Sequence, residues 1–145
     1  MFMIEKITAE ETHSIRQSVL RPGRPMQECI FNGDDDVQTL HLGAFTEGKL
    51  VGIASFMVDT NDYFHGKQYR LRGMAVLPEF RGMGYGKKLV THGENLLQQK
   101  ECDILWFNAR EIALKFYNGQ GFNIKGAPFE ISTVGTHHVM YKKLS

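Results

Sequence analysis

The chain has 145 residues, the length of one domain, and 42 % of them are apolar, which excludes intrinsic disorder. Seventeen Lys and Arg side chains against sixteen Asp and Glu leave a formal net charge of +1. This charge is too small for a broad electrostatic surface that binds nucleic acid or an anionic membrane. Fifteen residues are glycine, about 10 % compared with an average near 7 %, and this excess needs an explanation.

The cysteines and the hydropathy pattern exclude further classes. Cys29 and Cys102 form no Cys-x-x-Cys pair and have no histidines at zinc-finger spacing, so neither a disulfide framework nor a zinc site is indicated. The sequence contains no apolar run of signal-peptide type and none as long as a membrane span. We therefore expect a single domain over residues 1–145 in the cytoplasm, with no metal ion, no nucleic-acid partner and no membrane partner.

The first predicted elements are a strand and a helix. Residues Phe2–Thr8 alternate apolar and polar side chains, as a short strand does. Thr8 followed by Glu11 has the spacing of a capping box, which predicts a helix over about Ala9–Leu20. The two prolines in Arg21–Pro25 end this helix.

A turn-rich segment and a hairpin follow. The run Asn32–Asp36 has three consecutive aspartates without the spaced ligands of a calcium loop, so we expect them to lie in a solvated turn. Residues His41–Thr46 and Leu50–Asp59 are rich in apolar and β-branched side chains, and the short turn between them contains Gly48. This pattern predicts an antiparallel hairpin. Gln68–Val76 alternates as a further strand.

Strands and helices alternate in the second half. Apolar positions after Gly84 recur at spacings of three and four, which predicts an amphipathic helix. These positions are Leu89, Val90, Gly93, Leu96 and Leu97. The remaining predicted elements are a strand at Ile104–Asn108, a helix at Glu111–Gly119, and strands at Phe122–Lys125 and Thr136–Lys143. The order indicates an α/β fold.

Six residues between a predicted strand and a predicted helix form a glycine-rich turn, Arg81-Gly82-Met83-Gly84-Tyr85-Gly86. Backbone N–H groups at a helix N-terminus are unpaired, and glycine lets an anion approach them closely. A P-loop would need glycine and a hydroxyl residue where the chain has Arg81 and Lys88. A Rossmann fingerprint would need glycine at Lys87. The turn therefore indicates a local anion site of another kind, with Arg81, Lys87 and Lys88 as nearby cations.

The segment around this turn resembles the central motif of the GNAT superfamily of N-acetyltransferases. That motif is Gln/Arg-x-x-Gly-x-Gly/Ala, and Arg81, Gly84 and Gly86 occupy its fixed positions. The stretch Asn108–Phe122 resembles the family's next motif. The resemblance implies an α/β fold with a mixed central sheet of about six to seven strands, an antiparallel N-terminal half, splayed strands four and five, and flanking helices.

The resemblance also implies a reaction and its residues. Acetyl-CoA is the implied cosubstrate, and the acetyl group passes directly to a primary amine of a small molecule or a protein. The implied backbone contacts to the coenzyme A pyrophosphate are Arg81, Gly82, Met83, Gly84, Tyr85 and Gly86. The implied contacts to the pantetheine arm are Met74, Ala75, Val76 and Asn108. Tyr117 is implied to protonate the departing thiolate.

Elementary chemistry agrees with a role for Tyr117 and leaves one alternative. Direct acyl transfer needs a neutral amine, donors for the developing oxyanion and a proton for the sulfur. A phenol has a pKa near 10 and a thiol one of about 8.5, so Tyr117 donates only when it is held close to the sulfur. No Gly-x-Ser-x-Gly motif is present, as direct transfer allows. The alternative is that Tyr117 is a core aromatic residue beside Phe116.

The general base and the acceptor contacts are less specific. The strand before the turn carries Arg70 and Arg72 but no acid, so the glutamate that many relatives use there is missing. Glu130, His137 and His138 are the candidate bases, and the two histidines face opposite sides of a strand. Arg72 is suited to binding a carboxylate or phosphate of the acceptor, or to a salt bridge within the chain. Arg72 and His138 are our candidate acceptor contacts.

Two other functions remain open at this point. One is a non-catalytic acyl-CoA-binding or regulatory module that kept the glycine turn and lost the chemistry. The other is a nucleotide-phosphate binder, which predicts stabilisation by ATP or NAD instead of acetyl-CoA. A homodimer is a frequent assembly among the proteins that this sequence resembles.

Overall fold

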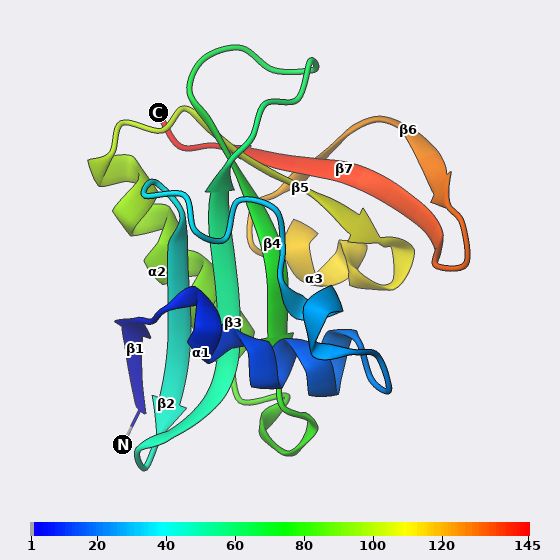
Figure 1. Cartoon of the computed structure of the whole chain (residues 1–145). Helices are drawn as coiled ribbons and strands as arrows, with labels where there is room; N and C mark the ends of the chain where they lie inside the picture. Colours follow the sequence, from blue (N-terminus) through cyan, green and yellow to red (C-terminus); the bar gives the residue numbers. More distant parts are fainter. Residues whose placement is uncertain (1) are drawn as a thin grey trace. The chain divides into compact units, whose positions relative to one another are not determined.

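A computed structural model describes residues 2–145. Its strands are β1 (Phe2–Lys6), β2 (Leu40–Thr46), β3 (Lys49–Val58), β4 (Gln68–Val76), β5 (Ile104–Arg110), β6 (Asn123–Ile131) and β7 (Gly135–Lys143). Its helices and helical turns are α1 (Ala9–Ile15), η1 (Arg16–Leu20), η2 (Met26–Cys29), η3 (Pro78–Phe80), α2 (Tyr85–Gln99), η4 (Glu111–Ala113) and α3 (Leu114–Asn118). The strands form one mixed sheet in the order β1-β2-β3-β4-β5-β7-β6 (Figure 1).

The chain forms two compact units. The first contains Met1–Val58 and Leu71–Leu96, and the second contains Asp59–Arg70 and Leu97–Ser145. Strand β4 contributes residues to both units, since the division falls between Arg70 and Leu71.

Helix α1 of the first unit begins as its sequence predicts. The Thr8 hydroxyl accepts a hydrogen bond from the Glu11 N–H at 3.1 Å, and the Glu11 carboxylate accepts one from the Thr8 N–H at 2.9 Å. This capping box satisfies two N–H groups that the helix cannot pair itself. The helical segment reaches Leu20 as expected, but its last five residues form the π-helical turn η1, which starts at the buried Arg16.

The first four strands and their two helices form the apolar core of the first unit. Strands β1, β2 and β3 are antiparallel neighbours, so the predicted hairpin and the antiparallel N-terminal half of the sheet are confirmed. Helices α1 and α2 lie on opposite faces of these strands (Figure 1). Ile15 of α1 packs with Ile53 and Ala75 on one face, while Gly93 of α2 lies against Phe56 on the other. Ile53 and Phe56 are separated by an odd number of positions in β3, so their side chains point to opposite faces.

A buried ion pair joins η1 to the segment before β2. Arg16 is fully buried and donates to the two carboxylate oxygens of Asp34 at 2.7 and 2.9 Å. It also donates to the Cys29 carbonyl oxygen at 2.8 Å and to Ser55 Oγ at 3.0 Å. Ser55 Oγ lies 2.7 Å from His41 Nδ1. The network therefore connects five segments of the first unit: η1, η2, the segment before β2, β2 and β3.

The expected solvated turn at Asn32–Asp36 is wrong for Asp34, which is only 5 % exposed. Burial by itself raises the pKa of a carboxyl group. At Asp34 the hydrogen bonds from Arg16 and the Phe31 N–H, together with the Arg16 charge, outweigh burial and hold the pKa below its ordinary value. Asp35 and Asp36 are exposed, as predicted. The sequence pattern misses Asp34 because its partner lies 18 residues earlier.

We predict that Gly93→Ala destabilises the protein by about 1–2 kcal/mol. A Cβ at Gly93 would overlap the Phe56 ring, and overpacking a core outweighs the helix propensity that alanine gains over glycine. Urea denaturation measures the change. Asn95→Ala is the control, because Asn95 is exposed on the same helix and its replacement creates no overlap. A Gly93→Ala protein as stable as the wild type would contradict this packing.

The second unit is built on β5, β7 and β6, which are antiparallel neighbours. Strand β5 also pairs in parallel with β4, at three residue pairs from Gln68–Ile104 to Arg70–Trp106. Strand β6 extends beyond the predicted Phe122–Lys125, with an irregularity between Lys125 and Phe129. Gly126 and Pro128 in this stretch are unfavourable in the interior of a strand, so the sequence pattern does not predict one there. An edge strand tolerates both residues.

Both cysteines are free and buried, and no helix within residues 2–145 is long and apolar enough to cross a membrane.

Candidate active site

The glycine-rich turn lies in the first unit between β4 and α2. Gly82 and Gly84 have φ values of +80° and +84°, which side chains of L-residues rarely adopt. A Cβ at either position would meet no atom within 4 Å. Glycine is therefore required there by the backbone conformation and not by packing, and the space beside the main chain is open. The arrangement fits a phosphate ligand, because the first N–H groups of α2 have no partner within the helix.

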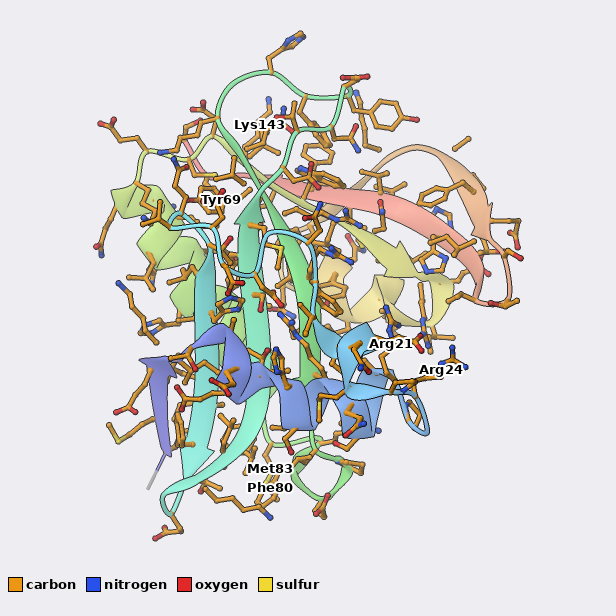
Figure 2. The ribbon with its side chains drawn as sticks, in the orientation of Figure 1. Arg21, Arg24, Tyr69, Phe80, Met83 and Lys143 are labelled. Atoms are coloured by element: carbon orange, nitrogen blue, oxygen red, sulfur yellow. The ribbon has the colours of Figure 1, made fainter. Side chains whose placement is uncertain are left out.

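The side chains around this turn are anchored on its flanks. Arg81 Nε donates to the Val76 carbonyl oxygen at 3.1 Å, which ties the turn to the end of β4. Lys88 Nζ lies 4.2 Å from the centre of the Phe2 ring, and the Tyr85 ring lies 5.0 Å from the same ring. Figure 2 shows Phe80 and Met83 on the segment between β4 and α2, and Met83 is 59 % exposed. Arg81 and Lys88 are thus beside the turn, and residues 81–84 are exposed.

Strand β4 changes conformation just before the predicted pantetheine contacts. Gly73 has a φ of +63°, and its Cα packs so closely that a Cβ would lie 2.9 Å from the Phe31 ring. This positive φ interrupts the extended backbone immediately before Met74. Ala75 is buried and Val76 is half-buried, with its carbonyl oxygen accepting the Arg81 bond.

Arg72 lies over the Phe31 ring, which two other arginine side chains also approach. Its guanidinium carbon is 4.6 Å from the centre of the Phe31 ring, and that of Arg16 is 3.9 Å from the same centre. Arg21, labelled in Figure 2, lies 5.9 Å from it. Sequence reasoning missed this cation–π cluster, because no local pattern connects Phe31 with a strand about forty residues later.

Tyr117 is buried in an aromatic cluster of the second unit. Its ring centre lies 4.3 Å from that of Phe107, 5.1 Å from Phe116 and 6.0 Å from Phe122. The residue is 8 % exposed, and burial raises the pKa of its phenol to about 12. The hydroxyl is therefore protonated throughout the neutral and mildly alkaline range.

Asn108 and Tyr117 lie on opposite faces of β5. Asn108 pairs with Val139 of β7, on the face where Trp106 and Val139 pack. Phe107, the residue that contacts Tyr117, points to the other face because side chains alternate along a strand. The two predicted residues thus come from one sequence motif, and the fold presents them to different sides of this strand.

The three candidate bases have different surroundings. Glu130 is exposed and accepts a hydrogen bond from the Thr136 hydroxyl. His137 is buried, its Nδ1 donates to the Gly135 carbonyl oxygen at 2.8 Å, and its ring lies against Phe129. His138 Nε2 lies 3.7 Å from a carboxylate oxygen of Glu111. The two histidines point to opposite faces of β7.

Metal ligands are not gathered in the described part of the chain: residues 2–145 contain no group of three or more His, Cys, Asp or Glu side chains that could hold a metal ion.

The sequence model of the acetyltransferase (GNAT) family matches residues 4–122, and the chain belongs to this family. The uncharacterized N-acetyltransferase YitI of Bacillus subtilis (strain 168) is 36 % identical over 145 residues, which cover 99 % of this chain and 97 % of that protein.

Solved structures share the fold. The ribosomal-protein-S18-alanine N-acetyltransferase from Escherichia coli matches with a TM-score of 0.80 at 20 % identity, over 100 % of this chain and 95 % of that one. An aminoglycoside 6'-N-acetyltransferase complexed with coenzyme A matches with a TM-score of 0.78 at 13 % identity, over 99 % and 97 % of the two chains. Because these identities are low, both structures support the fold and not a particular activity or substrate. With the family match, the chain is an N-acetyltransferase.

Proposed function

We propose that this enzyme transfers an acetyl group from acetyl-CoA directly to a primary amine of a small molecule or a protein. The observation that carries the proposal is the open glycine turn at the start of α2, with Gly82 and Gly84 in left-handed conformations and free space beside both. The backbone N–H groups of such a turn can bind a pyrophosphate without a large positive charge nearby. This matters here because the net charge of the chain is only +1.

The proposed cofactor contacts follow from this geometry. The backbone of residues 81–86 binds the pyrophosphate, and the main chain of Met74, Ala75 and Val76 pairs with the pantetheine arm. Asn108 makes a polar contact to the same arm. The bond from Arg81 to the Val76 carbonyl supports a positioning role for this arginine, since it connects the two segments that receive the cofactor.

The proposed role of Tyr117 is hydrogen-bond donation to the sulfur as the carbon–sulfur bond breaks. A phenol of pKa about 12 is a weaker acid than a thiol of pKa about 8.5. Full transfer of its proton to the thiolate would therefore be uphill by about 5 kcal/mol. Donation within a hydrogen bond avoids this cost and still stabilises the developing negative charge.

We propose Arg72 and His138 as the acceptor contacts. A guanidinium over the Phe31 ring is held in a defined place, and it suits a carboxylate or phosphate on the acceptor. The alternative of a non-catalytic acyl-CoA-binding module is less well supported, because Tyr117 is retained and buried and the family and its curated relative are acetyltransferases.

Two experiments test the proposed function. The first compares the thermal stability of the protein with acetyl-CoA, ATP and NAD, and we expect stabilisation by acetyl-CoA. The second measures thiol release from acetyl-CoA with a panel of amines that includes aminoglycosides, polyamines, amino acids and a peptide with N-terminal alanine. Stabilisation without turnover of any amine would support the binding module, and stabilisation by ATP or NAD alone would contradict both functions.

We predict that Gly84→Ala raises the KM for acetyl-CoA at least tenfold and changes kcat little. The substitution strains a backbone at φ +84° and adds a methyl group where the pyrophosphate approaches. Gly48→Ala is the matched control, because Gly48 has a φ of +75°, has equally open surroundings and lies in the β2–β3 turn. Steady-state kinetics at varied acetyl-CoA distinguish them. An equal rise in KM for both variants would show that the effect comes from general destabilisation.

The remaining proposals concern the chain as a whole. We propose that the two units behave as one domain over residues 1–145, in the cytoplasm, where free cysteines remain reduced. One cooperative transition in calorimetry supports the single domain, and two separate transitions contradict it. We also propose a homodimer, which sedimentation of the purified protein tests.

A further inference from the structure

The His138 side chain is largely covered, yet it makes none of the hydrogen bonds that an imidazole in such a place normally makes. It is 12 % exposed, and within residues 2–145 neither ring nitrogen has a hydrogen-bond partner. Buried polar side-chain atoms in folded proteins nearly always have a partner, either in the protein or in bound water or ligand. Nδ1 and Nε2 thus keep their hydrogen-bonding capacity for a further molecule, and the contact of Nε2 with the chain is the Glu111 carboxylate oxygen at 3.7 Å.

His138 lies on the same face of the second unit as Tyr117. It is directly opposite Ala109 in the β5–β7 pairing, and directly opposite residues share a face. Ala109 lies two positions after Phe107, whose ring contacts Tyr117 at 4.3 Å. A group that can accept a proton and a group that can donate a hydrogen bond thus lie on one side of this sheet.

The other two candidate bases lack these features. His137 points to the opposite face, and its Nδ1 is already bonded to the Gly135 carbonyl oxygen. Glu130 lies on the exposed edge strand β6 and is bonded to the Thr136 hydroxyl. An exposed carboxylate next to water gives little control over where a proton goes.

Few charged groups face the His138 ring. Turn η4 contributes Glu111, whose carboxylate oxygen is 3.7 Å from Nε2, and β5 contributes the uncharged Ala109. On its other side β7 faces residues 126–128 of β6, where the pairing is interrupted and no side chain is ionisable. Tyr117 of α3 lies on the same face through its contact with Phe107, and it is neutral at physiological pH. The Glu111 carboxylate is therefore placed to stabilise an imidazolium.

We propose that His138 is the general base of the acetyl transfer and that Glu111 is its positioning residue. The inference rests on the proposed function. A neutral His138 accepts a proton from the ammonium group of the acceptor, and the freed nitrogen lone pair forms a C–N bond with the acetyl carbonyl carbon. The C–S bond then breaks, and the sulfur takes its electron pair and receives a proton from solvent with Tyr117 as hydrogen-bond donor. The nitrogen of the new C–N bond loses its second proton to solvent, and the proton held by His138 also returns to solvent. One ammonium group and one thioester thus give one amide, one thiol and one released proton.

The main test compares His138→Gln with His137→Gln. We expect His138→Gln to lower kcat/KM for the amine at pH 7 by 100-fold or more, which is the usual size of a general-base contribution. The gap to the wild type narrows as the pH rises towards the pKa of the acceptor amine, because more of the amine is then already neutral. His137→Gln stays within about threefold per folded molecule at every pH. If His138→Gln does not fold, His138→Asn takes its place.

Two outcomes overturn the inference. One is a folded His138 variant with a kcat/KM within about threefold of the wild type at all pH values. The other comes from NMR of the histidine rings of the wild type, with a ketone analogue of acetyl-CoA and an amine added. We expect the His138 ring signals to move and those of His137 to stay in place, and unmoved His138 signals contradict contact with the reactants.

The same two measurements separate this inference from the proposed function. If the wild type acetylates no amine of the panel, the proposed function fails. The NMR experiment with acetyl-CoA alone then decides about His138, since ring signals that do not move overturn its placement at the acyl group. If the wild type is active and the His138 variants match it, the function stands and the base must be another group.

Discussion

Replacement of Tyr117 by phenylalanine is expected to lower kcat by about 100-fold to 1,000-fold and to leave the KM for acetyl-CoA within about twofold. The change removes only the hydroxyl, and the phenylalanine ring keeps the packing against Phe107 and Phe122. The lost donor acts when charge develops on the sulfur, so the loss appears in the transition state and not in binding. Steady-state kinetics with a fixed amine measure both constants.

The matched control for Tyr117 is Tyr141→Phe. Tyr141 lies on β7 in the same unit, on the face that packs against Phe64, and loses the same hydroxyl. We expect its kcat to stay within about twofold of the wild type. Equal kcat losses in the two variants, or an unchanged kcat in Tyr117→Phe, would remove Tyr117 from the chemistry and leave it as a core aromatic residue.

The raised pKa of Tyr117 also predicts how the stability of the fold changes with pH. Because its pKa is raised in the folded protein, the buried phenol stabilises the fold fully below pH 10 and loses this contribution as the pH rises to about 12. Two pKa units correspond to about 3 kcal/mol. The stability difference between the wild type and Tyr117→Phe therefore shifts in favour of the variant above pH 10. In activity assays up to pH 10, no loss of rate is expected from ionisation of Tyr117.

The second large effect concerns stability. Arg16→Met is expected to lower the free energy of unfolding by about 3–5 kcal/mol, because it leaves the Asp34 carboxylate buried without its partner. The total stability of a domain is about 5–15 kcal/mol, so this single change removes a large part of it. Urea denaturation at pH 7 measures the difference.

A double variant distinguishes a buried charge pair from a simple packing defect at Arg16. Replacing both members with apolar residues, as in Arg16→Met with Asp34→Leu, removes the uncompensated charge. We expect the double variant to be more stable than Arg16→Met alone, although Ser55 and the Cys29 carbonyl lose their donor as well. A double variant as unstable as the sum of the single changes would show that the pair is not coupled.

Local patterns account for most of the secondary structure. The capping box at Thr8, the strand at Gln68–Val76 and the apolar face of α2 are found where the periodicity predicts them. Each of these signals is complete within one element. The full length of strand β6 is not predicted, because Gly126 and Pro128 interrupt the alternation of its side chains. The strand forms through its pairing with β7.

Local sequence patterns predict only part of the candidate site. The glycine turn is visible in sequence, because its backbone conformation demands glycine at particular positions. The choice among Glu130, His137 and His138 depends on which face each side chain occupies and which neighbours have already bonded to it. Alternation along the strand predicts that the two histidines face opposite sides, but only the tertiary structure shows that His138 makes no hydrogen bond and lies beside Glu111.

The sequence by itself determined the alternation of strands and helices, the family and the need for glycine in the turn before α2. These depend on spacings of a few residues, where backbone geometry relates neighbours directly. Only the tertiary structure decided that Asp34 is a buried partner of Arg16, that Asn108 and Tyr117 face opposite sides of β5, and that Tyr117 has a pKa of about 12. Those properties arise from burial and from contacts between segments far apart in the chain, and no local spacing encodes them.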